Sequence, residues 1–260
     1  HGGGGGHLSY MTEIYTIARA GYAVLAYDNT GTMGSQGKSL VGFYQAVRDL
    51  EAAVQYAVSS PSLSAFKPAL VGHSWGGYAV CCASAHVKDQ ISAVVALSAP
   101  NDVARLALDP IRAKLGAAVL LYPAFAMASV LVNGIRSRKT VSNVLLAAGD
   151  LPILLIQGDA DPTVTMKNSP VSNEKLSARD NVKTVICKDR GHNVYQTAES
   201  EKYLMKVFSM ISAAEKKYKS SGTIPAQEKA KLYDIDYALI TEEDENIMNT
   251  ILSFIGKAMY

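Results

Sequence analysis

Short apolar runs alternate with longer amphipathic stretches along most of the chain. The apolar runs predict strands over residues 22–27, 69–72, 93–98, 152–158 and 182–187. Helices are predicted between and after them, over residues 9–20, 42–59, 75–86, 168–177 and 197–217. A last helix is predicted over residues 242–259, with Thr241 as its N-cap and acidic residues in its first turn. Strands that alternate with helices are typical of a parallel sheet with crossover helices, so the predicted fold class is α/β.

Two regions depart from this rhythm. Residues 101–149 lie between two predicted strands and have the pattern of several helices. We therefore predict a helical cap or lid there. It would be inserted into a core formed by residues 1–100 and 150–260. Residues 216–240 are charged and contain a Ser-Ser-Gly turn and a proline, so we expect a surface excursion ahead of the last helix.

One stretch within the predicted insertion is long and apolar enough to need a membrane test. No charged residue occurs from Leu115 to Ile135, and this length approaches that of a spanning helix. Pro123 interrupts the stretch and alanine dominates it. We therefore expect a buried or substrate-facing pair of helices and no membrane span.

Composition narrows the possible partners and the compartment. The 260 residues are 48% hydrophobic, enough for one sizeable core, and the net charge of +2 gives no reason to expect a nucleic-acid partner. Cys81, Cys82 and Cys187 have neither zinc-site spacing nor a disulfide framework, so we expect no metal and no cofactor. Such cysteine usage favours a reducing, cytoplasmic location, although a targeting signal upstream of His1 would not be visible.

The strongest chemical signal is the pentad Gly-His-Ser-Trp-Gly at residues 72–76, between a predicted strand and a predicted helix. A small residue and a glycine on either side of serine are typical of a nucleophile elbow, whose sharp turn exposes the serine and leaves no room for a Cβ nearby. The pentad alone can arise by chance, so its meaning depends on what accompanies it.

Three further segments could supply the rest of an acyl-transfer site. The run His-Gly-Gly-Gly-Gly-Gly-His at residues 1–7 could aim backbone N–H groups at an oxyanion, or could be a flexible, tag-like loop. Asp159 and Asp161 follow a predicted strand, where doubly wound folds keep their sites, although an Asp-Pro turn is also common. His192 follows the next predicted strand, and taken alone it would be an ordinary loop histidine.

Together the segments follow the chain order serine, aspartate, histidine, each just after a strand, which is the order of an α/β-hydrolase triad. The chemistry is coherent because a serine hydroxyl needs a base, and imidazole can take and return a proton near neutrality. A carboxylate would fix the imidazole tautomer and stabilise the imidazolium.

On these motifs the chain resembles the α/β-hydrolase superfamily, in particular the branch of serine aminopeptidases, monoacylglycerol lipases and carboxylesterases. The stretch from Asp28 to Ser35 is similar to that branch's Asp-x-x-Gly-x-Gly-x-Ser motif, although Thr32 replaces the usual histidine. The resemblance implies Ser74 as nucleophile, His192 as base and Asp161 as acid, with Asp159 as the alternative acid.

The resemblance also implies where the oxyanion would bind, namely the backbone N–H groups of Gly3 and Trp75. Of the other residues in these motifs, His73 is expected to pack under the elbow, and His7 could order the glycine run.

The resemblance carries a structural expectation as well. The strand that precedes the His-Gly loop normally lies beside the nucleophile strand, and this sequence starts after it. We therefore expect N-terminal strands to be missing from this chain and upstream residues to supply them, because a gap inside the sheet would leave backbone groups unpaired.

The expected activity is hydrolysis of a small or medium carboxylic ester by a serine hydrolase, through an acyl-enzyme. A peptidase or amidase of the same fold and a non-catalytic binding module are the alternatives. The apolar residues of the insertion could roof an acyl pocket or could simply seal the insertion against the sheet; they are Val119, Leu120, Leu121, Tyr122, Phe125, Met127, Val130 and Leu131.

Overall fold

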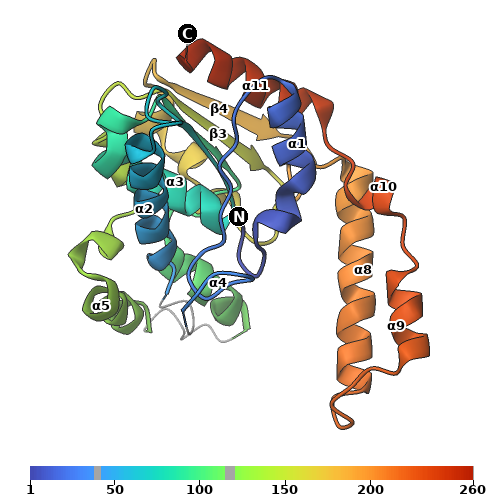
Figure 1. Cartoon of the computed structure of the whole chain (residues 1–260). Helices are drawn as coiled ribbons and strands as arrows, with labels where there is room; N and C mark the ends of the chain where they lie inside the picture. The colour runs from blue at the N-terminus through green and yellow to red at the C-terminus, as the bar shows by residue number, and fades with distance from the viewer. Residues whose placement is uncertain (38–41, 115–120, 260) are drawn as a thin grey trace.

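A parallel β-sheet lies at the centre of the computed structural model, which describes residues 1–37, 42–114 and 121–259 (Figure 1). Its four strands are hydrogen-bonded in the order β1 (Ala69–His73), β2 (Ala93–Leu97), β3 (Ile153–Gly158) and β4 (Val182–Cys187). The strands predicted over residues 69–72, 93–98, 152–158 and 182–187 are confirmed to within one residue. The predicted α/β class, a parallel sheet flanked by helices, is therefore the observed one.

Helices connect and cover these strands. The bounds are α1 (Met11–Arg19), α2 (Gln45–Ser59), α3 (Trp75–Val87), α4 (Val103–Lys114), α5 (Tyr122–Asn133), α6 (Val141–Leu146), α7 (Glu174–Ser177), α8 (Ala198–Lys217), α9 (Ala226–Tyr233), α10 (Tyr237–Ile240) and α11 (Glu245–Met259). Short 3₁₀ helices are η1 (His7–Tyr10), η2 (Lys88–Gln90), η4 (Ile135–Arg138), η5 (Met166–Asn168) and η6 (Pro170–Ser172).

The core has two halves, one on each face of the sheet. Strands β2 and β3 are buried along their whole length, as expected for parallel strands covered on both faces. Val94 and Leu155 point toward α2, α3 and α6, whereas Val95 and Leu154 point toward α11. Because side chains alternate along a strand, the apolar runs of β2 and β3 serve both halves of the core.

Two predicted helices have different bounds in the structure. The helix predicted over residues 168–177 is wrong, because the segment is divided into η5, η6 and the four-residue α7, with Pro170 starting η6. The last helix begins at Glu245, and the carboxylate of Asp244 accepts hydrogen bonds from the N–H groups of Asn246 and Ile247, both at 3.1 Å. The predicted N-cap, Thr241, instead ends α10.

The strand predicted over residues 22–27 is not formed. This segment makes no ladder with β1 or with any other described strand, and residues 23–26 are exposed. Strand β1 accordingly lies at an edge of the sheet, where Val71 is 40% exposed although it is an apolar residue in mid-strand. A strand needs a neighbour for its backbone groups, so the apolar run alone cannot form one. This partial N-terminal sheet agrees with the expectation that neighbouring strands are missing from the chain.

The region predicted as an insertion carries α4, α5, η4 and α6 between β2 and β3. Of its apolar residues, Leu121, Tyr122, Met127 and Leu131 are exposed and Phe125 and Val130 are half-buried; Val119 and Leu120 lie outside the described residues. No helix in the described ranges is long and apolar enough to cross a membrane.

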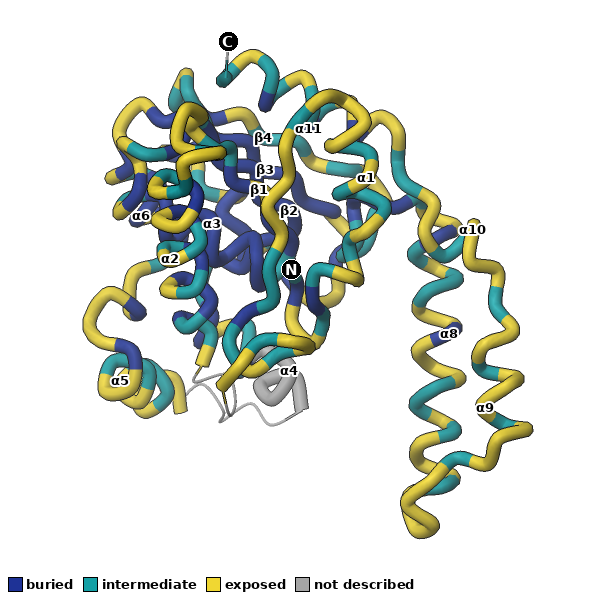
Figure 2. The backbone as a smooth tube through the Cα atoms, in the orientation of Figure 1, coloured by how far each residue is buried: buried dark blue, intermediate teal, exposed yellow. Residues whose placement is uncertain are grey.

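Helices α8 and α9 extend away from the sheet as an arm (Figure 1). Most residues of α9 are exposed, as predicted for the excursion over residues 216–240, and so are most residues in the outer half of α8 (Figure 2). Thr197 caps α8, since its hydroxyl accepts a hydrogen bond from the N–H of Ser200 at 3.1 Å. The start of α8 lies beside the loop that follows β4, where Glu201 accepts the N–H groups of Gly191 and Asn193, while its far end enters solvent.

A half-buried carboxyl, that of Glu13 on α1, lies near the carboxyl of Glu243. Burial raises the pKa of Glu13 to about 7, and the nearby charge of Glu243 raises it further in the same direction. A carboxyl whose pKa is raised by folding stabilises the folded state below its ordinary pKa of 4.5, and this contribution is lost as the pH rises through about 7.

We therefore expect Glu13→Gln to leave stability nearly unchanged at pH 5 and to raise the free energy of unfolding at pH 8 by about 1–3 kcal/mol. Urea unfolding at the two pH values measures the difference. Glu215→Gln, at an exposed position on α8, is the matched control and should change the free energy of unfolding by the same small amount at both pH values. Equal effects of Glu13→Gln at pH 5 and pH 8 would contradict the assignment.

Candidate active site

Ser74 occupies a strained turn between β1 and α3. Its φ is +55° and its ψ is −115°, a conformation that L-residues other than glycine rarely adopt. A Cβ on Gly72 would lie 2.3 Å from the carbonyl oxygen of Gly76, and a Cβ on Gly76 would lie 2.9 Å from the backbone nitrogen of His1. The glycines of the pentad are therefore required by close backbone approach, as a nucleophile elbow demands.

The three predicted triad residues meet at one end of the sheet. The Oγ atom of Ser74 lies 2.8 Å from Nε2 of His192, and Nδ1 of His192 lies 2.7 Å from Oδ2 of Asp161. Ser74 follows β1, Asp161 follows β3 and His192 follows β4, so three parallel strands carry the three groups to the same edge. Because the ionised carboxylate only accepts hydrogen bonds, Nδ1 of His192 carries the proton and Nε2 faces the serine hydroxyl as an acceptor.

Asp161 is buried and well supplied with donors. Its Oδ1 accepts hydrogen bonds from the N–H groups of Thr163 at 2.7 Å and Val164 at 2.8 Å. The amide of the fully buried Gln157 donates to Oδ2 at 3.0 Å. The alternative acid, Asp159, is exposed, and its Oδ1 accepts the N–H of Asp189 at 2.7 Å. Of the two aspartates, Asp161 contacts the imidazole of His192, whereas Asp159 holds the loop that leads to it.

The glycine run lies beside the elbow. A Cβ on Gly2 would be 3.6 Å from Cβ of Ser74, and the His1 ring packs edge-on to the Trp75 ring with centroids 6.4 Å apart. Within the described chain, the N–H groups of Gly3 and Trp75 have no hydrogen-bond partner. The N–H of Trp75 is free because it lies in the first turn of α3.

His7 and Asp28 hold the far end of the run. The backbone N–H of His7 donates to Oδ1 of Asp28 at 2.8 Å, and Nδ1 of His7 lies 3.0 Å from the same oxygen. These hydrogen bonds hold the pKa of Asp28 below its ordinary value. The run is thus fixed to the segment that follows residues 22–27, in line with the expectation that His7 orders it.

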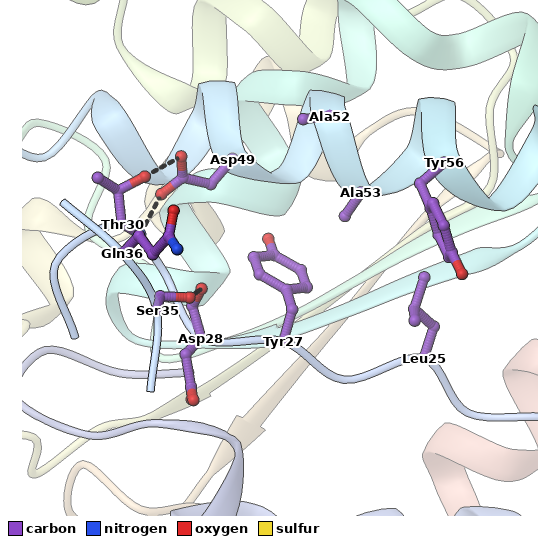
Figure 3. A pocket seen from close by; sticks show the side chains of 10 residues that line it. All are labelled: Leu25, Tyr27, Asp28, Thr30, Ser35, Gln36, Asp49, Ala52, Ala53 and Tyr56. Carbon is purple, nitrogen blue, oxygen red and sulfur yellow. Dashed lines mark hydrogen bonds between the residues drawn. The ribbon is translucent and has the colours of Figure 1, made fainter. Parts of the chain in front are cut away.

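A separate cavity of about 320 Å³ lies between α2 and the segment that contains Tyr27 (Figure 3). Its lining includes Asp28 and Asp49 but none of the three triad residues. The carboxylate of Asp49 accepts the N–H and the hydroxyl of Thr30, both at 2.8 Å. Both acidic groups are therefore already engaged in holding the loop, and the cavity is distinct from the triad.

Several contributors to the site were not found from the sequence. Tyr10, Ser98 and Glu201 each hydrogen-bond to the backbone or side chains around Ser74 and His192. None of them belongs to a motif, and Glu201 resembles any charged residue in the first turn of a helix. Asp28 directly follows a predicted strand, and this position marks it as a candidate site residue, but the sequence assigns it no role. In the described ranges no cluster of metal-ligating side chains occurs.

The fold and the geometry at the elbow define an α/β-hydrolase. The match to a family model is more specific: residues 8–214 match the prolyl oligopeptidase family, so the chain belongs to that family of hydrolases. A search of curated proteins finds no match.

Solved structures support the fold. The Pyrococcus furiosus esterase Pf2001 aligns with a TM-score of 0.61 at 18% identity, covering 100% of this chain and 81% of its own. A Paleococcus ferrophilus monoacylglycerol lipase aligns at 0.51 and 22% identity, covering 75% and 84%, respectively. A thermophilic esterase from Thermogutta terrifontis aligns at 0.52 and 13% identity, covering 100% and 89%. At these identities the likeness establishes the architecture and nothing about the substrate.

The close approach at Gly72 generates a stability prediction. Gly72→Ala should lower the free energy of unfolding by about 2–4 kcal/mol, since its Cβ would meet backbone atoms that cannot move aside. Gly3→Ala is the matched control, because nothing lies within 4 Å of a Cβ at Gly3. Thermal and urea unfolding of both variants measure the difference, and equal stabilities would contradict the steric argument.

Proposed function

We propose that the chain is a serine hydrolase that cleaves carboxylic esters of small or medium acyl length. The observation that carries the proposal is the continuous hydrogen-bond series from Oγ of Ser74 through His192 to Asp161, with lengths of 2.8 Å and 2.7 Å. Such a series lets imidazole act as a general base on a hydroxyl that is otherwise a weak nucleophile.

In the first half of the reaction, Oγ of Ser74 attacks the ester carbonyl carbon while Nε2 of His192 takes its proton. Asp161, held by Thr163, Val164 and Gln157, keeps the imidazole in the required tautomer and stabilises the imidazolium. The tetrahedral intermediate then collapses, His192 returns the proton to the departing alcohol, and an acyl-serine remains.

In the second half, Nε2 of His192 takes a proton from water as it attacks the acyl-serine carbonyl, and then gives that proton to Oγ of Ser74 as the bond to serine breaks and the acid leaves. In both halves the carbonyl oxygen gains negative charge. We assign the N–H groups of Gly3 and Trp75 to that oxygen, because both lack partners in the described chain and both belong to segments next to Ser74. Donors that are already fixed cost little reorganisation when the charge develops.

A peptidase or amidase is the second candidate, and the family match favours it, since the matched family is named for an oligopeptidase. The ester proposal follows the names of structural neighbours that share the architecture, two esterases and a monoacylglycerol lipase. The same triad serves both reactions, and an amide additionally needs protonation of a poorer leaving group. The intact Ser74–His192–Asp161 geometry argues against the third candidate, a binding module without activity.

The triad assignment predicts large and selective losses. Ser74→Ala should lower kcat for p-nitrophenyl esters by about 10⁴-fold or more and abolish fluorophosphonate labelling. Asp161→Asn should lower kcat by about 10⁴-fold, because an amide no longer selects the tautomer. Asp159→Asn, two residues away, is the matched control and should retain most activity. Labelling of Ser74→Ala, or equal losses from the two Asn variants, would refute the assignment.

Substrate preference separates the two enzyme candidates. We expect higher kcat/KM on p-nitrophenyl esters of two to eight carbons, taken as roughly the small-to-medium range, than on aminoacyl p-nitroanilides. The comparison uses the same protein preparation and substrates below KM. Faster turnover of the anilides would replace the esterase proposal by the peptidase while leaving the triad assignment intact.

A further inference from the structure

The histidine next to the nucleophile takes part in two hydrogen bonds that involve neither Ser74 nor substrate. His73 is buried, its Nε2 lies 3.0 Å from the backbone oxygen of His192, and its Nδ1 lies 2.8 Å from the hydroxyl of Tyr10. A carbonyl oxygen only accepts, so Nε2 of His73 must carry the proton. In the neutral ring Nδ1 is then an acceptor, and the Tyr10 hydroxyl donates to it.

Tyr10 extends this path to the glycine run. Its hydroxyl oxygen accepts the backbone N–H of Gly2 at 2.9 Å, so the one hydroxyl accepts from Gly2 and donates to His73. Three hydrogen bonds therefore join Gly2, Tyr10, His73 and the backbone of His192. Burial lowers the pKa of His73 well below its ordinary value and raises that of Tyr10 to about 12. Both groups consequently keep the same protonation state throughout the neutral range.

Other contacts hold the same loop but do not reach the glycine run. The hydroxyl of Ser98 donates to the backbone oxygen of His192 at 2.7 Å. The carboxylate of Glu201, at the start of α8, accepts the N–H groups of Gly191 at 3.2 Å and Asn193 at 2.8 Å. Among the hydrogen bonds of the described residues, the path through Tyr10 and His73 is the one that connects the loop of His192 with the segment that contains Gly3.

We propose that Tyr10 and His73 are positioning residues that fix the His192 loop and the glycine run relative to each other. The proposal rests on the proposed function, since it assigns the two residues to the geometry of that same reaction. Neither side chain hydrogen-bonds to the reacting atoms, and the His73 ring packs on the imidazole of His192 with centroids 4.8 Å apart. They act through the backbone of His192 and of Gly2, whose neighbour Gly3 supplies one of the N–H groups assigned to the oxyanion.

The path matters because the reaction needs two geometries at once. The imidazole must stay within hydrogen-bond distance of Ser74, and the oxyanion donors must face the carbonyl that Ser74 attacks. A displacement of about 1 Å at either place can cost on the order of 10²-fold in rate. Since both segments are loops, a shared buried link restrains them more than separate anchors would.

The test is a double-mutant cycle on kcat with p-nitrophenyl butyrate, using the full chain. Tyr10→Phe keeps the ring that packs on Tyr195, with centroids 5.7 Å apart, and removes only the hydroxyl. His73→Gln keeps an amide donor for the His192 oxygen and loses the acceptor for Tyr10. We expect each to lower kcat by about 10–100-fold with KM changed less than about threefold. His73→Leu, which loses both bonds, should fall further than His73→Gln.

The decisive arm is the double variant Tyr10→Phe/His73→Gln. If the two residues form one path, kcat of the double variant should be close to that of the lower single variant, because the path is already broken. Losses that multiply would indicate two independent structural effects and overturn the proposal. Tyr15→Phe, at an exposed tyrosine on α1, is the matched control and should behave as the parent. Melting temperatures measured alongside identify variants that fail to fold. If Tyr10→Phe unfolds, the loss of kcat in His73→Gln still tests the path, because that variant removes the acceptor for the Tyr10 hydroxyl.

Fluorophosphonate labelling of the parent separates this proposal from the proposed function. A parent that labels at Ser74 and hydrolyses ester, together with a Tyr10→Phe variant of equal kcat, refutes the positioning role alone. A parent that neither labels nor hydrolyses refutes the proposed function, and the positioning role falls with it.

Discussion

The left-handed backbone at Ser74 is the constraint on which the rest of the site depends. A φ of +55° at a non-glycine residue is costly and persists only where the surroundings allow no alternative. Here the surroundings are the backbone of α3, packed directly over β1 at Gly72, and the backbone of His1, packed directly over Gly76. The turn lifts the hydroxyl out of the sheet toward His192. It also brings the start of α3 and the glycine run together, so one strained residue organises both the proposed nucleophile and the N–H groups proposed as oxyanion donors.

The groups around Ser74 come from segments far apart in the sequence, and each is held by its own short-range device. Asp161 is fixed by the N–H groups of its own turn, and the base loop by Asp159, Glu201 and Ser98. The glycine run is fixed at its far end by Asp28. The strands of the sheet bring these segments to one common edge. The local hydrogen bonds then fix the positions of the side chains at that edge.

Much of this arrangement could be predicted from the sequence because it depends on local chemistry. The buried strands β2 and β3 are continuous apolar runs, and the pentad, the turn after β3 and the loop after β4 are recognisable from residue type and order. What could not be predicted depends on neighbours that a sequence does not reveal. Residues 22–27 have the apolar run of a strand but lack a partner, and Pro170 divides a segment whose overall pattern is helical. Tyr10, Ser98 and Glu201 acquire their roles only through contacts across the fold.

The position of β1 at the edge of the described sheet has a consequence for the turn at Ser74. The strand that ends in the nucleophile is also the strand with one row of backbone groups unpaired by any described neighbour, and its Val71 is 40% exposed. Backbone at such an edge can open without unfolding of the interior, and it can accept a foreign strand. A strand supplied beside β1 would pair this row of backbone groups and cover Val71. Whatever occupies that edge would therefore also stabilise the turn at Ser74, because β1 leads directly into it.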